Sequence, residues 1–231
     1  MAYSIALFDA DNTLLDFTRA EHTALCECLS ARNLPTDNAT VSLYSSINDR
    51  HWKMLERGET TRERLKVARF AEFFMAVGYD GDPAVMADSY VQALSRQRQL
   101  VDGALELILS LYGRCRLYIV TNGITSVQKS RFGGCPLAPY FDHCFISEEM
   151  GCAKPEKRFF DQVAASIPNF DPQEAIVIGD SLSSDILGGI HAGLHTCWFN
   201  PDGKISPADM DITYTVSQLW EIQNIILGTV N

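Results

Sequence analysis

Two carboxylates lie two residues apart near the start of the chain, where Asp9 and Asp11 follow the apolar run Ile5-Ala6-Leu7-Phe8. Such a run predicts a buried strand, and acids at its end lie at the rim of a sheet, where open α/β folds bind ligands. Both acids can face one cleft only if the chain turns sharply after Asp9, because alternate strand residues are separated along the strand. Close carboxylates repel unless a shared proton or a cation compensates. The pair therefore indicates either a metal site or an acid/base pair.

Polar residues also follow three later strand-like runs. They are Thr121 and Asn122 after the run 116–121, Lys154 at the start of the helix after the run 143–147, and Asp180 and Asp185 after the run 175–179. In a parallel sheet the C-terminal ends of the strands share one edge, so all these side chains can converge with the first acid pair. The carboxylates are hard oxygen ligands of the kind that Mg²⁺ takes, and a lysine balances their charge. One carboxylate could then attack phosphorus while a second transfers protons.

The elements that must position these residues alternate along the second half of the chain. Strands are predicted at 3–9, 116–121, 143–147, 175–179 and 195–199, and helices at 103–112, 125–132, 155–166, 184–192 and 217–227. The strands are apolar throughout, which is typical of a sheet covered on both faces. Residues 1–16 and 100–231 are therefore predicted to form an α/β core, a doubly wound parallel sheet of Rossmann-like type.

Between the first and second strands the hydrophobic periodicity is only helical. Four helices are predicted, at about 18–32, 39–56, 60–78 and 83–96. Residues 17–99 are therefore expected to form a helical cap domain inserted after the first strand. Its candidate contacts to a substrate are Phe17, Tyr44, Trp52 and Arg62, although Phe17 and Trp52 are residue types that more often serve as core or hinge packing.

The four strand-end motifs together resemble those of haloacid dehalogenase (HAD) superfamily phosphatases with a helical cap of the C1 type. In order, the motifs are Asp9-Ala10-Asp11-Asn12-Thr13, Thr121-Asn122-Gly123, Lys154-Pro155 and Gly179-Asp180-Ser181-Leu182-Ser183-Ser184-Asp185. The resemblance implies that Asp9 is the nucleophile and Asp11 the general acid/base. It also implies that Thr121 and Lys154 take part in catalysis, and that these two residues and Asn122 bind the substrate phosphate.

The same resemblance implies a Mg²⁺ cofactor. The ion would bind the Asp9 carboxylate, the Asp11 main-chain carbonyl and Asp180. Asp185 would act mainly through a water molecule or by orienting its neighbours. The expected partner is accordingly a small phosphate ester.

Two longer stretches, 146–155 and 185–198, resemble the pyrimidine 5′-nucleotidases of this superfamily. This resemblance implies hydrolysis of nucleoside monophosphates such as UMP, dUMP and dTMP. Both stretches belong to the predicted core, whereas substrate choice belongs to the cap. Another small ester such as a sugar phosphate, a phosphomutase, a haloacid dehalogenase and a binding protein on the same scaffold are the alternatives. Asp11 argues against a dehalogenase, which needs no acid/base there, and the presence of every catalytic position argues against a binding protein.

Composition narrows the possible partners. The formal net charge of the 231 residues is −10, which argues against a nucleic acid polymer. A small phosphate ester remains compatible, because one metal ion and one lysine can reverse the local field. No apolar run reaches the ~20 residues that a membrane span needs, so no membrane is expected. The seven cysteines form no Cys-x-x-Cys motif and no secretory signal is recognised, so free thiols in the cytoplasm are expected.

Other ligand-binding patterns fail on spacing. If Asp9 opened an EF-hand loop, positions six and twelve would be Gly and Glu, but they are Leu14 and Ala20. His191 and His195 are four apart, yet a glycine and a strand follow the first at once, so they do not share a helical face. No Gly-x-Gly-x-x-Gly follows the first strand, so a dinucleotide site has no support.

Overall fold

The computed structural model describes residues 3–229, which divide into two compact units. One unit comprises the chain up to Asp16 and from Gln99 onward, and the other comprises Phe17–Arg98. In the first unit the two segments that lead to and from the helical unit are paired, because the Asp16 N–H donates to the Gln99 carbonyl at 2.9 Å. Among the helices of residues 3–229, none has both the length and the apolar character to cross a membrane.

Within residues 3–229, six parallel strands form the sheet of the first unit, in the order β3-β2-β1-β4-β5-β6. They are β1 (Ile5–Phe8), β2 (Arg116–Thr121), β3 (His143–Ile146), β4 (Ala175–Gly179), β5 (His195–Phe199) and β6 (Tyr214–Val216). Phe8, the last residue of β1, lies opposite Ile119 of β2 and Ile178 of β4. The residues that follow these three central strands therefore meet at one edge of the sheet.

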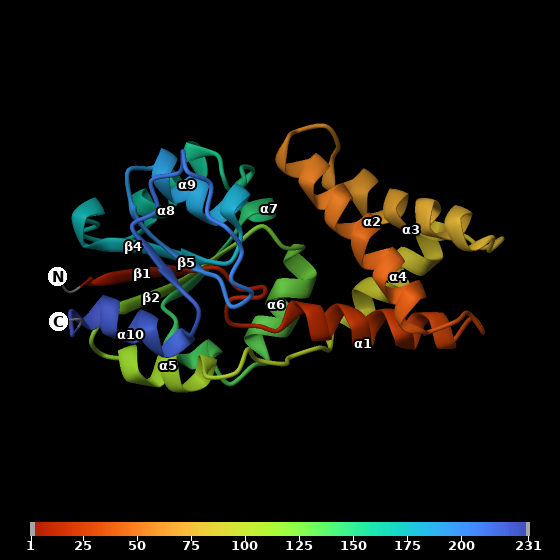
Figure 1. Ribbon diagram of the computed structural model, residues 1–231, viewed down its shortest axis with the longest axis horizontal. Helices are drawn as coiled ribbons and strands as arrows, with labels where there is room; N and C mark the ends of the chain where they lie inside the picture. Colours follow the sequence, from red (N-terminus) through yellow and green to blue (C-terminus); the bar gives the residue numbers. More distant parts are fainter. Residues whose placement is uncertain (1–2, 230–231) are drawn as a thin grey trace. The chain divides into compact units, whose positions relative to one another are not determined.

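Helices cover both faces of the sheet, with α5 and α10 on one face and α8 and α9 on the other (Figure 1). The helices of this unit are α5 (Ala104–Leu111), α6 (Thr125–Gly133), α7 (Ser147–Met150), α8 (Lys157–Ser166), α9 (Leu187–His191) and α10 (Leu219–Leu227). Short 3-10 turns at Ala138–Tyr140 and Pro172–Glu174 complete the connections. The predicted doubly wound α/β fold is confirmed.

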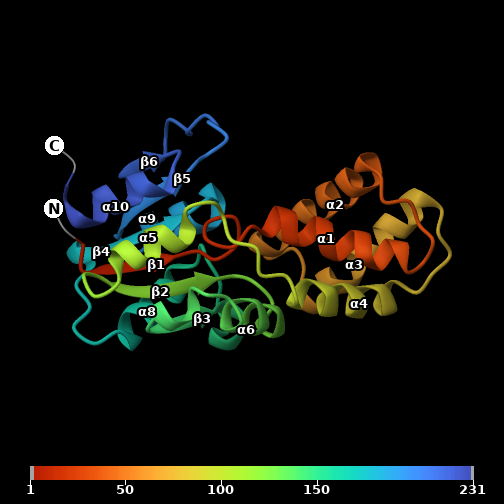
Figure 2. The same ribbon diagram turned by 90° about the horizontal axis from the view of Figure 1, so that it is seen from below.

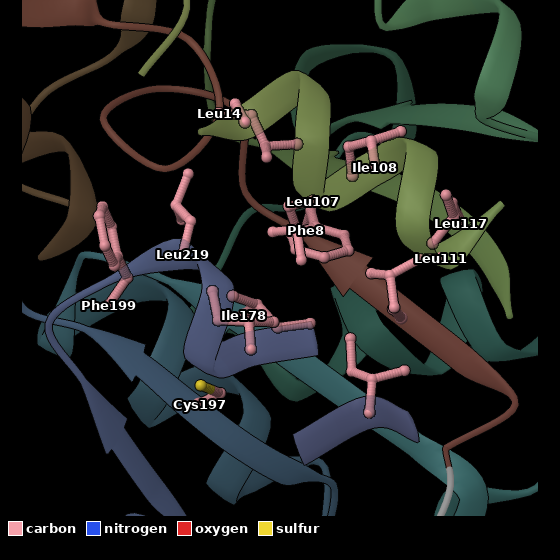
Figure 3. Packing of buried hydrophobic residues seen from close by; sticks show 14 of the residues in the cluster. Phe8, Leu14, Leu107, Ile108, Leu111, Leu117, Ile178, Cys197, Phe199 and Leu219 are labelled. Atoms are coloured by element: carbon pink, nitrogen blue, oxygen red, sulfur yellow. The ribbon is translucent and has the colours of Figure 1, made fainter. Parts of the chain in front are cut away.

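Alternate residues of β1 enter two different hydrophobic cores. Phe8 packs with Leu107 of α5 and Ile178 of β4 in one core (Figure 3). Leu7 packs with Phe159 of α8 in the other. Side chains of a strand alternate between its faces, so a strand that is buried on both sides must be apolar at every position.

The second unit is a bundle of four helices, as predicted (Figure 2). They are α1 (Phe17–Ser30), α2 (Asn38–Glu56), α3 (Arg62–Val77) and α4 (Pro83–Ser95), with α1 against α4, α2 against α3 and α3 against α4. Tyr44 lies in the core of the bundle, stacked on Phe70 with a centroid distance of 5.0 Å. The Tyr44 side chain is fully buried, so the prediction that Tyr44 meets a substrate is wrong.

Three parts of the first unit differ from the prediction. Helix α7 was not predicted, and its first residue, Ser147, was expected to end a strand, because four residues are too few to show a helical periodicity. Strand β6 is absent from the predicted set, because three residues are too few to give a readable alternation of apolar and polar side chains. The helix predicted at 184–192 begins instead as a π-helical turn, Leu182–Ile186, which continues into α9. In a π-helical turn the backbone hydrogen bonds join residues five apart, not four apart as in an α-helix. Such turns often occur at functional sites.

Candidate active site

Three carboxylates gather where β1 and β4 end. Asp9 follows β1, Asp180 follows β4, and Asp185 lies in the π-helical turn. One carboxylate oxygen from each of the three lies within 4.8 Å of the others. The sheet register explains this cluster, because it aligns the last residues of the two adjacent strands. The structure thus brings together three of the residues that the sequence predicted to bind a metal.

A buried lysine lies among these carboxylates. The Lys154 ammonium donates to Asp9 Oδ1 and to Asp185 Oδ1, both at 2.6 Å, and to the Val120 carbonyl at 2.7 Å. Its three hydrogens therefore have three protein acceptors. A lysine with only 1% of its surface exposed is tolerated because its charge is paired and hydrogen-bonded.

Burial and like charge make the carboxylates difficult to ionise together. Burial raises the pKa of Asp9 well above its usual range, although Lys154 opposes this shift. Burial, followed by the charge of Asp185, raises the pKa of Asp180 to about 7. Burial alone would lower the pKa of Lys154, but Asp185 and Asp9 raise it by more. Three ionised carboxylates against one ammonium leave two negative charges, and the clustered oxygen donors suit a hard divalent cation.

Gly179 makes room for Asp185. A Cβ atom on Gly179 would lie 2.2 Å from Asp185 Oδ2, so only glycine allows this carboxylate to fold back against the end of β4. The same oxygen accepts a hydrogen bond from the Ser181 N–H at 3.1 Å. On the other side of the loop, the Trp198 indole N–H donates to the Asp180 carbonyl at 2.9 Å. These contacts fix the loop that carries two of the three acids.

The side chain of Asn122 holds the backbone of Lys154. Its Nδ2 donates to the Lys154 carbonyl at 2.8 Å, and its Oδ1 accepts from the Lys154 N–H at 3.0 Å. Both ends of the amide are thus bonded to the loop that carries the lysine. A direct contact between Asn122 and a substrate phosphate stays a prediction.

Thr121 is oriented by two donors. Its Oγ1 accepts from the Gly123 N–H and from Gln128 Nε2, both at 3.1 Å. A hydroxyl oxygen has two lone pairs, so both are engaged and the O–H proton is directed to a further acceptor. The buried Thr121 is therefore prepared to donate a hydrogen bond.

The Asp11 carboxylate is bonded to α6, which the sequence analysis did not foresee. Arg131 Nη1 pairs with Asp11 Oδ1, and Gln128 Nε2 donates to Asp11 Oδ2 at 2.5 Å. The sequence does place Gln128 and Arg131 three positions apart on a short predicted helix, and this spacing puts them on one face. That spacing also fits a solvated helix surface, so it did not single them out.

The remaining candidates belong to the helical unit. Phe17 opens α1, Trp52 lies in α2, and Arg62 opens α3. Each of these side chains is half-buried, so part of its surface is accessible. Their contact with a substrate stays a prediction.

Comparison with known proteins places this geometry in a family. The model of haloacid dehalogenase-like hydrolases matches residues 3–193. The HAD-hydrolase YfnB of Bacillus subtilis is 39% identical over 97% of this chain and 95% of its own. The pyrimidine 5′-nucleotidase PynA of Streptococcus pneumoniae is 37% identical over 94% of this chain and 92% of its own. The pyrimidine 5′-nucleotidase YjjG of Escherichia coli is 32% identical over 98% and 99%, respectively.

Solved structures agree with the sequence relatives. A crystal structure of YfnB bound to magnesium superposes with a TM-score of 0.93 and covers 98% of this chain and 99% of its own. The L-2-haloacid dehalogenase of Xanthobacter autotrophicus has a TM-score of 0.76 at 16% identity, with both chains covered completely, which indicates a shared fold alone. The family match spans strands β1 to β4, the helical insertion and every motif that carries the acid cluster. This chain is a hydrolase and belongs to the haloacid dehalogenase-like hydrolase family.

Proposed function

We propose that this chain is a Mg²⁺-dependent phosphomonoesterase that hydrolyses pyrimidine nucleoside 5′-monophosphates such as UMP, dUMP and dTMP. The observation that carries the proposal is the cluster of Asp9, Asp180 and Asp185 around the buried Lys154 ammonium. The substrate class is supported by two relatives that are pyrimidine 5′-nucleotidases, at 37% and 32% identity. The cofactor is supported by the magnesium-bound structure of YfnB.

In the first half of the reaction, an Asp9 carboxylate oxygen attacks phosphorus and forms an aspartyl-phosphate. The bond between phosphorus and the ester oxygen breaks, and its electron pair stays on the nucleoside oxygen, which takes a proton from Asp11. In the second half, Asp11 removes a proton from water, whose oxygen attacks phosphorus. The bond to Asp9 then breaks, inorganic phosphate leaves, and Asp11 is protonated again. Covalent and acid/base catalysis together suit a reaction as slow as phosphate-monoester hydrolysis.

The other residues of the site would bind and orient the phosphoryl group. The Thr121 hydroxyl, whose oxygen already accepts two hydrogen bonds, would donate its proton to a phosphoryl oxygen. Lys154 would offset the negative charge of Asp9 and of the incoming phosphate, and the Asn122 side chain would keep Lys154 in place. The main chain of Asn122 would add to the phosphate contacts.

The carboxylate cluster is suited to hold Mg²⁺. Asp9, Asp180 and the Asp11 main-chain carbonyl would bind the ion, and Asp185 would contribute through a water molecule or by orienting its neighbours. When bound, Mg²⁺ supplies positive charge that stabilises the phosphoryl oxygens as bonding changes.

The helical unit would select the leaving group. Phe17 and Trp52 offer aromatic surface on which a pyrimidine ring can stack, and Arg62 offers hydrogen-bond donors for carbonyl oxygens of the base. All three side chains are half-buried, as expected for residues that keep a binding surface.

A substrate panel with purified protein and Mg²⁺ tests this proposal. The kcat/KM for phosphate release from UMP and dTMP should exceed that from ribose 5-phosphate by at least about tenfold, which requires about 1.4 kcal/mol of extra transition-state binding by the base. Ribose 5-phosphate is the matched control, because it carries the same phosphate on the same sugar without a base.

The panel has two opposing outcomes. If ribose 5-phosphate or a hexose phosphate exceeds UMP, the nucleotidase assignment is wrong and the phosphatase assignment survives. If no ester in the panel releases phosphate with Mg²⁺, the phosphatase assignment is wrong as well.

A further inference from the structure

The buried Arg131 side chain is paired with Asp11, a carboxylate that is exposed enough to be solvated by water. Arg131 is completely buried, whereas 26% of the Asp11 side chain is exposed. Removing a guanidinium from water is costly. A protein with hydrophobic side chains in place of a buried ion pair would often be as stable as the protein with the pair. A partly exposed carboxylate, by contrast, is solvated by water without a protein partner. Stability alone therefore gives little reason for this pair, and its effect is on the orientation of the Asp11 carboxylate.

Gln128 completes the arrangement from the same helix face. Arg131 holds Oδ1 of Asp11 and Gln128 holds Oδ2, so the two oxygens of one carboxylate are bonded to different donors. Such a pair of contacts fixes the rotation of the carboxylate about its own axis. Gln128 also donates to Thr121, and so links the acid to the hydroxyl that ends β2.

Two neighbouring features support this arrangement. A Cβ atom on Gly123 would lie 2.2 Å from Gln128 Nε2, so the glycine of Thr121-Asn122-Gly123 leaves the space through which Gln128 reaches Asp11. The N-terminus of α6 is anchored by Glu148, whose Oε2 accepts from the Thr125 N–H at 2.7 Å. The helix that carries both donors is thus fixed at its start.

We propose that Gln128 and Arg131 are positioning residues for proton transfer by Asp11, acting from α6 on the two oxygens of its carboxylate. This inference rests on the proposed function, in which Asp11 protonates the leaving oxygen and then activates water. A proton donor must lie within hydrogen-bond reach of the leaving oxygen and in the right orientation, because proton transfer is sensitive to geometry. Losing either donor leaves Asp11 chemically intact but free to rotate.

The test compares esters that differ in their need for an acid. The nucleoside oxygen of UMP is a poor leaving group, whereas p-nitrophenolate and the acetate of acetyl phosphate leave without protonation. Arg131→Met and Gln128→Leu should lower the single-turnover rate of UMP cleavage by about 10²-fold, within the usual range for acid/base catalysis. The same variants should keep the first-turnover release of p-nitrophenolate or acetate within about threefold of the unaltered protein, and Asp11→Asn should give the same contrast.

The controls separate positioning from folding. Lys129→Met lies on the same helix, with 61% of the native side chain exposed and paired to Glu149, and it should leave both rates unchanged. Gln128→Leu buries no new charge, so it remains informative if Arg131→Met is unstable in thermal unfolding. Equal losses on both kinds of ester in Gln128→Leu would indicate a merely structural role and overturn the inference, as would an unchanged UMP rate. Failure of the proposed function is distinguishable, because it appears in the unaltered protein as absent cleavage of UMP.

Discussion

Replacing Asp9 with Asn should lower kcat for UMP by at least about 10⁴-fold while the protein stays folded, as expected when a covalent nucleophile is removed. Asn has nearly the same shape, and its amide oxygen can still accept a hydrogen bond from Lys154. The amide lacks the nucleophilic carboxylate, so it cannot form the aspartyl-phosphate. The loss should therefore appear in turnover and not in the fold.

The pKa shift of Asp9 predicts whether Asp9→Asn raises or lowers the stability of the fold. Burial raises the pKa of Asp9, so the folded state prefers the neutral form of this group more than the unfolded chain does. A neutral Asn at this position should therefore leave the thermal unfolding midpoint unchanged or raise it. Asp161→Asn, an exposed acid paired with Lys157, serves as the matched control and should keep full activity. Turnover near that of the unaltered protein in Asp9→Asn would remove Asp9 from the nucleophile role.

Replacing Lys154 with Met should reduce both stability and turnover. Without the ammonium, three carboxylates remain within 4.8 Å of one another with no cation among them. Breaking a buried ion pair by removing one partner costs about 3–5 kcal/mol, so urea unfolding without metal should show a loss of this size. Turnover should fall by about 10³-fold, because a fixed charge next to the phosphoryl group is lost.

Mg²⁺ should partly restore the stability of Lys154→Met. A divalent cation relieves the same repulsion, so adding it should stabilise the variant more than it stabilises the unaltered protein. Lys157→Met is the matched control, because this lysine is 60% exposed and its pair with Asp161 should contribute less than about 1 kcal/mol. If the free energy of unfolding of Lys154→Met without metal equals that of the unaltered protein, the claim that Lys154 offsets the charge of the carboxylates is wrong.

The sequence was sufficient to predict the acid cluster because the fold rule behind it is simple. Apolar runs identify the central strands, and a parallel sheet puts their C-terminal ends at one edge. Asp9, Asp180 and Lys154 meet there although they come from distant parts of the sequence. Local pattern and sheet topology together were enough for these residues.

The contacts that the sequence did not predict depend on packing that no local pattern encodes. Arg131 looks like a surface residue of a short helix until its partner Asp11, 120 positions away, is placed beside it. The sequence did not predict that the Asn122 side chain is hydrogen-bonded to the Lys154 backbone, while a contact of Asn122 with the substrate phosphate stays a prediction. Tyr44 looks like a cap residue for substrate, yet it is enclosed by other aromatic rings of the bundle. Each outcome follows from tertiary packing.

The central claim is that Asp9 attacks the phosphate of a pyrimidine nucleotide, and chemical trapping tests it most directly. The protein is mixed with UMP and Mg²⁺, quenched in acid and treated with borohydride, which reduces an acyl phosphate to an alcohol. Peptide mass spectrometry should then find homoserine at position 9, dependent on UMP and absent from Asp9→Asn. Steady turnover of UMP without homoserine at position 9, or with homoserine at Asp11 instead, would contradict the account.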